Sequence, residues 1–497
     1  MSLADNTSGV STDQGVQDFG YKQEFRREIK RFASFAVGFS FISITTGIFT
    51  TYGSVLNWGG PRGVWTWPIV ILGQLAVALV FASLASRIPL AGYSYQWTSQ
   101  LVNSRVGWLI GWVSFTFLVV VVVSVDYAIA STVLPSLFRY TETPLNAWLV
   151  TALVILVQML LILFSTRWTA RVNNAAVATE LTGIIGLIVL LLIVGAVRGI
   201  LHPDHVFSTG VVSPVNYFSL GGLFAAGPFM LSFLLGAFTI VGFEAAANLA
   251  EETEEPHRVV PFAMWSAVVL SGIVGFIFLL TLNLVSGDLK ALSASSTPIA
   301  DIIIQTLGGV VGDILLVVVT FSIFACGLVI FLTATRLTWA MSRDQRFPGA
   351  PIFARINERT GTPVTATLLI GVLTEIVLAI FANQANALSN LFGAATLLPA
   401  IIYLFTVLMY AFTRRKLPPA HGFNLGAFEW PVIIFAIVWL VFELLIFRDA
   451  QFATPWIYTL VMFAIGLVYF AFLLVRRPQS LERLPSTGTE AKLLTEN

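Results

Sequence analysis

Residues 238–248, Phe-Thr-Ile-Val-Gly-Phe-Glu-Ala-Ala-Ala-Asn, place one carboxyl group in the middle of an apolar segment. A charge at the centre of a membrane costs several kcal/mol, so Glu244 has to be paired, protonated or next to a wet cavity. Gly242, two residues earlier, lowers the cost of interrupting a helix. The stretch indicates either a broken helix at a binding site or a protonated glutamate that ties helices together.

A second polar stretch lies five predicted spans earlier in the chain. Residues 43–53, Ser-Ile-Thr-Thr-Gly-Ile-Phe-Thr-Thr-Tyr-Gly, carry six hydroxyl groups and two glycines. Such residues can satisfy backbone groups freed by an unwound turn, and they also occur where helices pack closely in membranes. This segment alone leaves both interpretations open.

The composition of the whole chain places these stretches in a membrane. Of the 497 residues, 57% are hydrophobic and 11% are charged, and the mean hydropathy is +0.86. Soluble domains carry about 25% charged residues. A single cysteine, Cys326, excludes a disulfide scaffold, and the net charge of +1 gives no sign of nucleic-acid binding.

Apolar runs of about 20 residues, the length that crosses a bilayer, recur along the chain. They are continuous rather than alternating, which indicates helices and not a β-barrel. The sequence predicts an all-α integral membrane protein with twelve transmembrane helices, at residues 33–57, 64–86, 106–134, 147–166, 177–197, 227–250, 262–285, 309–335, 364–382, 387–412, 428–447 and 455–475.

Lysine and arginine predict the orientation, because they concentrate in cytoplasmic loops. With the N-terminus inside, 22 of the 27 Lys and Arg lie on the cytoplasmic side. We therefore expect a cytoplasmic N-terminal tail at residues 1–32, a transporter domain at 33–475 and a cytoplasmic C-terminal tail at 476–497. No apolar segment precedes a cleavage site, so no signal peptide is expected.

The five-span interval between the two polar stretches predicts an inverted repeat, since a unit with an odd number of spans is upside down in its second copy. Repeat one would cover about residues 33–197 and repeat two about 227–412, with two extra helices at about 428–475. Interrupted helices at corresponding positions of two repeats mark transporter binding sites.

Other classes of membrane protein fit less well. An embedded enzyme needs a cluster of catalytic or metal-binding groups, but all four histidines lie in predicted loops or at span edges, and neither H-E-x-x-H nor G-x-S-x-G occurs. A voltage sensor needs a ladder of arginines within a span, and the predicted spans contain none. We expect no enzyme activity, cofactor or metal. A solute channel without alternating access is an alternative to a transporter.

Three motifs resemble those of the amino acid–polyamine–organocation superfamily of permeases. They are G-F-E-A followed by A-E-E-T-E-E-P-H-R-V-V-P within 242–261, A-S-R-I-P-L-A-G-Y-S-Y-Q-W at 85–97, and A-T-R followed by A-M-S-R-D-Q-R-F-P within 334–348. Glu255 replaces the usual Asn of the first motif. Thr45-Thr46-Gly47-Ile48 replaces the usual G-S-G-I of the first span. With this substitution and residues 65–68, the chain looks closest to the amino acid/choline branch, which includes 4-aminobutyrate permeases.

The resemblance implies a leucine-transporter-type fold of five plus five inverted helices. It also implies a secondary active transporter of the plasma membrane that moves an amino acid or a related amine such as 4-aminobutyrate by alternating access, with proton coupling or exchange. A choline or polyamine permease of the same fold is the alternative. The expected partners are the small-molecule substrate, protons and the lipid bilayer, and no nucleic acid.

The helix breaks supply the candidate substrate-binding residues. Backbone N–H groups at the start of a half-helix favour a carboxylate, and carbonyls at its end favour an ammonium. The predicted contacts are Ser43, Ile44, Thr45, Thr46, Gly47, Ile48, Ile240, Gly242, Phe243 and Glu244.

Phe243 is the predicted lid over the substrate, although core packing is an alternative role. The predicted coupling or gating residues are Glu244, Phe243, Asp126, Arg87 and Glu252. Among them, Asp126 would line the pathway or else pair near the outer end of its span. Arg87 and Glu252 would belong to a cytoplasmic latch of opposite charges.

Glu244 is the predicted proton carrier, because a carboxyl that alternates between a dry and a wet site can bind and release a proton. We expect Glu244→Gln to abolish pH-dependent uptake while the protein still folds; unchanged pH dependence would remove this role. Sodium coupling through Ser322 and Thr320 is the alternative. Glu180, near the predicted start of its span, is expected to be interfacial, and Glu375 and Glu443 are expected to be structural.

Overall fold

The computed structural model describes residues 16–482 except 17, 18, 22, 26, 165, 358, 359, 385 and 421. All of the named elements in this part of the chain are helices, and three isolated bridges are the only extended pairings there. The prediction of an all-α membrane protein is confirmed. Residues 1–15 of the predicted N-terminal tail and 483–497 of the predicted C-terminal tail lie outside the described residues.

Eleven helical stretches of the described chain are long and apolar enough to cross a membrane. They comprise α2 (Arg31–Ile42) with α3 (Ile44–Trp58), η1 (Pro61–Trp65) with α4 (Thr66–Arg87), α6 (Ser104–Ala128) with η2 (Ile129–Val133) and α7 (Leu134–Phe138), α8 (Pro144–Phe164), α9 (Thr166–Arg198), α13 (Pro256–Val285), α16 (Gly309–Arg343), α18 (Val364–Phe381), α19 (Ala387–Thr413) with η5 (Arg414–Lys416), η6 (Gly426–Phe428) with α20 (Glu429–Ile446), and η7 (Ala450–Phe452) with α21 (Ala453–Arg476).

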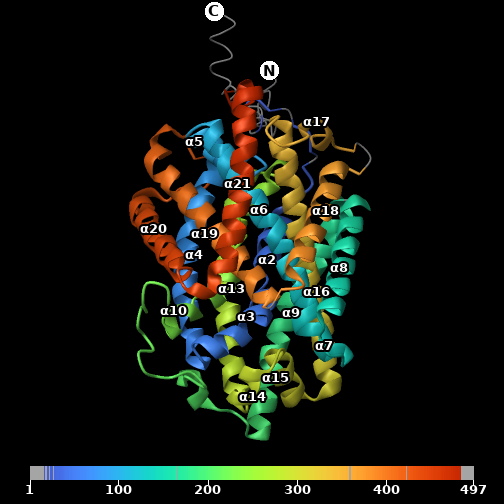
Figure 1. The fold of residues 1–497 in the computed structure, drawn as a ribbon, viewed down its shortest axis with the longest axis vertical. Coiled ribbons are helices and arrows are strands. Elements are labelled where there is room, and N and C mark those ends of the chain that lie inside the picture. The colour runs from blue at the N-terminus through green and yellow to red at the C-terminus, as the bar shows by residue number, and fades with distance from the viewer. Residues whose placement is uncertain are drawn as a thin grey trace, which may run out of the picture.

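Shorter helices gather at the two ends of the bundle (Figure 1). α5 (Tyr93–Leu101) and α17 (Ala350–Phe353) lie at the end drawn uppermost, while α14 (Leu289–Ala294) and α15 (Pro298–Leu307) lie at the opposite end. The remaining short helices are η3 (Pro203–Phe207) and α22 (Pro478–Glu482). The separation agrees with the predicted division of loops between two sides.

The predicted sixth span, 227–250, is not a continuous helix. It consists of α10 (Pro228–Ser232), α11 (Leu234–Thr239), α12 (Ala245–Asn248) and η4 (Ala250–Glu252). The longest apolar piece, Pro228–Thr239, has about 12 residues and so is about 18 Å long, short of the ~30 Å hydrocarbon core. The interruption predicted around Gly242 is present, and the number of twelve spans stays a prediction.

Helix α9 begins at Thr166, eleven residues before the predicted span 177–197. The intervening residues, among them Arg171, Asn173 and Asn174, lower the hydropathy and hide the helix start. Glu180 consequently lies 14 residues into the helix, about 21 Å along its axis. It is buried, and the prediction of an interfacial position is wrong.

Central and peripheral helices differ in burial. About 83% of the most apolar window is buried in Arg31–Trp58 and in Ser104–Phe138, against 17% in Ala450–Arg476. Exposed Leu and Val side chains on α8, α20 and α21 face outward, as expected for lipid contact. The two helix breaks therefore belong to the protected centre of the bundle.

Candidate functional site

The first span breaks at a single residue, Ser43. Its φ of 36° and ψ of 97° depart from helical values, so that α2 ends at Ile42 and α3 begins at Ile44. The Ser43 N–H donates to Phe39 O at 2.9 Å, and the Ser43 carbonyl accepts from Gly47 N at 3.0 Å. The Ser43 side chain accepts from the Thr46 N–H at 3.3 Å, which caps the second half-helix.

Glu180 reaches this break from α9. Its Oε1 atom accepts from Thr45 N at 3.1 Å, from Thr45 Oγ1 at 2.7 Å and from Ser43 Oγ at 3.0 Å. The side chain is almost fully buried. The N–H groups of Thr46 and Gly47, expected with that of Ile48 to bind a substrate carboxylate, already donate to Ser43 Oγ and Ser43 O within the protein.

The second break separates α11 from α12 over residues 240–244. Gly242 has a φ of +84°, which a side chain rarely adopts, and a Cβ atom there would lie 1.8 Å from the ring of Phe41. The Gly242 N–H donates to Tyr403 Oη at 3.0 Å, and Tyr403 Oη donates to Glu244 Oε2 at 2.6 Å. Tyr403 of α19 thus holds both the backbone and the carboxyl group of the break.

Replacing Tyr403 by phenylalanine is expected to loosen this break, because Glu244 Oε2 and the Gly242 N–H both lose a buried partner. Each buried group left unsatisfied costs about 1–3 kcal/mol. We expect a lower midpoint of thermal unfolding in detergent and slower uptake. Tyr410→Phe, which removes a hydroxyl bonded to Ser83 and Glu429 instead, is the control for losing a tyrosine hydroxyl of α19; equal uptake defects in both variants would contradict a specific role of Tyr403.

The two breaks lie against each other. A Cβ atom on Gly47 of α3 would lie 2.1 Å from Thr239 Oγ1 of α11, so only glycine permits this approach. A cavity of about 20 Å³ lies beside the contact. It has room for about one water molecule. Its lining is mostly apolar and comprises Phe41, Ile42, Thr46, Gly47, Val121, Val125, Phe238, Thr239, Val241, Cys326, Ile330 and Ala395.

Two of the sequence-predicted binding residues, Thr46 and Gly47, line this cavity. The other predicted binding residues are not in its lining: Ser43, Ile44, Thr45, Ile48, Ile240, Gly242, Phe243 and Glu244. Phe243 packs behind the cavity against Phe81 and Tyr403, with ring centroids 5.9 and 5.4 Å away. Phe41 and Phe238 are the aromatic rings that face the cavity.

Asp126 lies one residue beyond the cavity-lining Val125, at the contact of α6 with α8 and α16. Its Oδ1 atom accepts from Gln158 Nε2 at 2.8 Å, and Gln158 also donates to Phe324 O at 3.1 Å. A Cβ atom on Gly327 would collide with Asp126 Oδ1. The structure therefore pairs Asp126 with α8 and does not place it in the cavity lining.

Aromatic rings close the cavity toward the end of the bundle that carries α14 and α15. Phe238 contacts Phe392 with centroids 5.8 Å apart, and Phe392 contacts Trp58 with centroids 6.1 Å apart. Trp58 also contacts Phe452. A substrate entering from this side would have to part these rings.

Buried ion pairs close the opposite end. Arg336 Nε lies 2.6 Å from Glu252 Oε1, with side chains 0% and 7% exposed, and Arg343 Nη1 lies 2.9 Å from Glu251 Oε2. Glu251 Oε1 also accepts from Ala91 N, in the loop after α4. These contacts tie the segment after the second break to α16 and to the α4–α5 loop.

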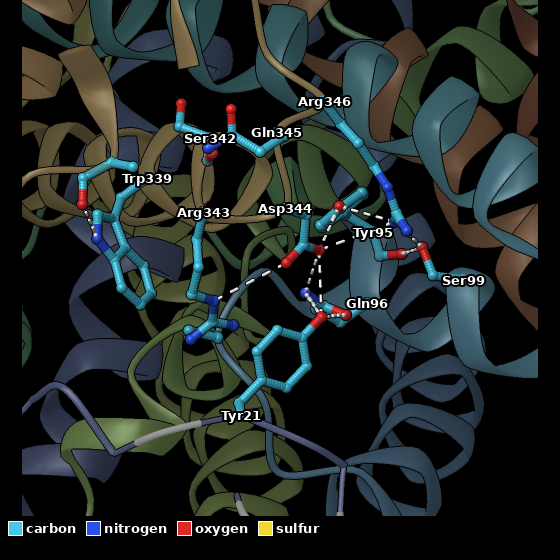
Figure 2. A network of polar contacts seen from close by, with 12 residues as sticks. Tyr21, Tyr95, Gln96, Ser99, Trp339, Ser342, Arg343, Asp344, Gln345 and Arg346 are labelled. Atoms are coloured by element: carbon cyan, nitrogen blue, oxygen red, sulfur yellow. Dashed lines mark hydrogen bonds and ion pairs between the residues drawn. The ribbon is translucent and has the colours of Figure 1, made fainter. Parts of the chain in front are cut away.

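Figure 2 shows the polar network that continues from these pairs. Asp344 Oδ2 accepts from Tyr95 at 2.5 Å, from Gln96 at 3.0 Å and from Tyr21 at 3.2 Å. Arg346 Nη1 donates to Tyr95 Oη at 2.9 Å. Burial, and then the charge of Asp344, raise the pKa of the Tyr21 phenol, so Tyr21 acts as a neutral donor.

Arg87 lies apart from the Arg336–Glu252 pair. It lies 4.0 Å from Glu429 at the start of α20, a carboxylate that also binds Arg414 at 3.1 Å and accepts from Tyr410. Of the predicted latch residues, Glu252 is thus in the central pair, and Arg87 belongs to a peripheral cluster.

The N-terminal segment lies over the same closed end. The Glu28 and Ile29 N–H groups donate to the Glu252 carbonyl at 3.0 and 2.9 Å. The ring of Phe25 lies under the Arg336 guanidinium, with the charge 4.8 Å from the ring centroid. This segment therefore contacts both partners of the buried ion pair.

Comparisons with known proteins agree with this architecture. The family model described as amino acid permease matches residues 29–475. An uncharacterised amino-acid permease of Schizosaccharomyces pombe is 28% identical over 465 residues, covering 90% of this chain and 84% of the relative. An amino-acid permease of Arabidopsis thaliana is 25% identical over 450 residues, with 86% of each chain covered. A thiamine transporter of Schizosaccharomyces pombe is 23% identical over 477 residues, covering 88% of this chain and 80% of the relative.

Proposed function

Because the chain belongs to the amino acid permease family, a family of membrane transporters and not of enzymes, we propose that it moves a small neutral amino acid across a membrane by alternating access. The observation that carries this proposal is the pair of helix breaks beside one small cavity. Breaks at such a position expose backbone groups to a substrate. The cavity in its closed form is too small for an amino acid, so binding requires one end of the bundle to open.

The substrate we favour is a zwitterion such as 4-aminobutyrate. The cavity lining is apolar apart from Thr46, Thr239 and Cys326, which suits a short aliphatic chain. Carbonyl groups at the end of α11 would face its ammonium. The thiamine transporter among the relatives supports keeping a cationic amine, such as choline or a polyamine, as the second candidate.

A competition screen tests the substrate assignment. Uptake of a labelled neutral amino acid mixture into transport-deficient cells would be measured with excess unlabelled 4-aminobutyrate, single amino acids, choline or putrescine. We expect 4-aminobutyrate or a neutral amino acid to compete. Counterflow in liposomes containing the purified protein separates a carrier from a channel, since only a carrier exchanges label against its gradient. Competition by choline or putrescine alone would favour the second candidate.

The proposed orientation has both termini in the cytoplasm and the protein in the plasma membrane. It rests on the excess of Lys and Arg at the end that carries α5, α17 and the buried ion pairs. This end is then the cytoplasmic gate, and the Phe238–Phe392–Trp58 rings form the outer gate. Repeats at about 33–197 and 227–412 would rock against each other to open one gate at a time.

Proton coupling or exchange drives transport in this proposal. Thr320 and Ser322, the residues considered for sodium, donate their hydroxyls to Leu316 O and Val318 O of their own helix. Glu244 would act in gating, because its bond to Tyr403 joins the second break to α19. Phe243 would support that contact from behind, and Asp126 would fix α6 to α8 as the gates move.

A further inference from the structure

Glu180 occupies the position at which the broken first span presents its N–H groups. Its Oε1 atom takes three hydrogen bonds, two from Thr45 and one from Ser43. The start of a helix favours an anion, because unpaired N–H groups and the helix dipole meet there. In the closed structure the chain itself supplies this anion, at the place where a substrate carboxylate would bind.

Hydroxyl groups connect Glu180 to the cavity. Thr46, which lines the cavity, donates from Oγ1 to Ser43 Oγ at 2.7 Å. Ser43 Oγ donates to Glu180 Oε1 at 3.0 Å. Since a hydroxyl both donates and accepts, this series can pass a proton by reorienting its O–H bonds. Glu180 is two hydroxyl groups from the cavity.

The hydrogen bonds that Glu180 accepts come from neutral groups. On the neighbouring helix α16, Cys326 donates from Sγ to the Phe41 carbonyl at 3.3 Å, and Asp126 on α6 is bonded to Gln158. Helices α3 and α8 carry no Asp, Glu, Lys, Arg or His. Other charged residues and histidines occur on α9 and on the helices packed against it. They lie toward helix ends or are absent from the cavity lining: Arg31, Arg167, Arg171, Arg198, His257, Arg258, Asp301, Asp313, Arg336 and Arg343.

We propose that Glu180 is the proton-binding residue of the transport cycle and takes up one proton each time a substrate carboxylate binds at the start of α3. Two carboxylates sharing these N–H groups would repel each other strongly in a buried site. The proton comes from water on the entry side and stays on a Glu180 oxygen while the substrate is bound. It returns to water on the exit side when the substrate leaves and Glu180 regains its hydrogen bonds.

This inference rests on the proposed function, because it requires a substrate with a carboxylate. The inference assigns the role of proton carrier to Glu180 in place of Glu244, the candidate from the sequence. The reason is position: Glu244 is bonded to Tyr403 behind the cavity, whereas Glu180 is bonded to the residues that begin α3. Glu180 is also joined to the cavity lining through Ser43 and Thr46.

The test uses the full chain in liposomes with labelled 4-aminobutyrate, or with the amino acid that the screen identifies. For the wild type we expect accumulation driven by an inward proton gradient, with uptake changing by at most about tenfold per pH unit, the limit for one coupled proton. For Glu180→Gln we expect at least a tenfold loss of gradient-driven accumulation. Counterflow should persist and become independent of pH, because the amide oxygen still accepts from Thr45 and Ser43.

Two further variants make the result specific. Glu443→Gln changes an equally buried carboxyl, bonded to Gln74 on α4 and not in the cavity lining, and is expected to keep proton-driven accumulation. Glu244→Gln is expected to slow uptake, because Glu244 acts in gating, but to leave accumulation dependent on the proton gradient. Loss of accumulation in Glu244→Gln but not in Glu180→Gln would overturn the inference and restore Glu244 as the carrier.

Two results would overturn the inference but keep the proposed function as a transporter. One is wild-type transport that does not depend on pH, and the other is transport only of amines that lack a carboxylate. A protein that transports none of the screened compounds would instead contradict the proposed function. Loss of counterflow in Glu180→Gln, with the protein folded by size-exclusion chromatography, would show a role in substrate binding alone and would also overturn the inference.

Discussion

Arg336→Ala is expected to open the end of the bundle proposed as the cytoplasmic gate, and to raise the reactivity of Cys326 at least tenfold from that side. The variant leaves Glu252 buried without its cation, and removing one partner of a buried pair costs about 3–5 kcal/mol. Cys326 is the single cysteine of the chain and lines the cavity, so it reports access without any added label site. Maleimide labelling in inside-out and right-side-out vesicles measures the effect on each side.

The matched control for this prediction is Arg139→Ala. Arg139 pairs with Asp313 at 3.2 Å on the opposite end, but the two side chains are 61% and 36% exposed. An exposed pair contributes about 0–1 kcal/mol, so Cys326 labelling should stay at the wild-type rate. Equal rates in the two arginine variants would show that the Arg336–Glu252 pair does not hold the gate.

Gly242→Ala is expected to prevent folding into the closed structure. A non-glycine residue at the observed φ of +84° costs about 1–2 kcal/mol in strain. The added methyl group would also overlap the Phe41 ring, which lines the cavity. We expect little monodisperse protein in detergent and a large fall in the unfolding temperature, followed by fluorescence during heating.

Gly199→Ala is the control that separates backbone strain at a positive φ from steric overlap of the added methyl group. Gly199 has a φ of +65°, but a Cβ atom there would have no neighbour within 4 Å. It should therefore show the cost of strain alone. Adding Phe41→Ala to Gly242→Ala should recover part of the lost stability. A Gly242→Ala protein as stable as Gly199→Ala would mean that the break at residues 240–244 is not packed as described.

Local sequence indicated both stretches that contain helix breaks, although residues 43–53 alone did not distinguish a break from close helix packing. Gly242 next to a carboxyl in an apolar run, and glycine among the hydroxyls of residues 43–53, lower the local preference for a regular helix. These signals depend only on neighbours along the chain, which is why they pointed to the stretches that contain Thr46, Gly47 and Gly242. The resemblance to permeases was confirmed by a family match over most of the chain.

Tertiary pairing was the part that sequence did not provide. Glu180 was misplaced because polar residues at the start of α9 shortened the apparent span. Tyr403 was missed because a single tyrosine in an apolar helix gives no sign of a partner 159 residues away. The partner of Arg87 was not predicted, since opposite charges in several loops leave many pairings possible and only the packing of α20 selects Glu429.

The N-terminal segment would make the two openings of the proposed cycle unequal. Opening the ion-paired end must detach Glu28 and Ile29 from the Glu252 carbonyl and lift Phe25 from Arg336, whereas opening the opposite end leaves these contacts in place. An empty carrier of the proposed kind would then rest open at the end that carries α14 and α15, and removing the segment would shift its population toward the state open at the ion-paired end.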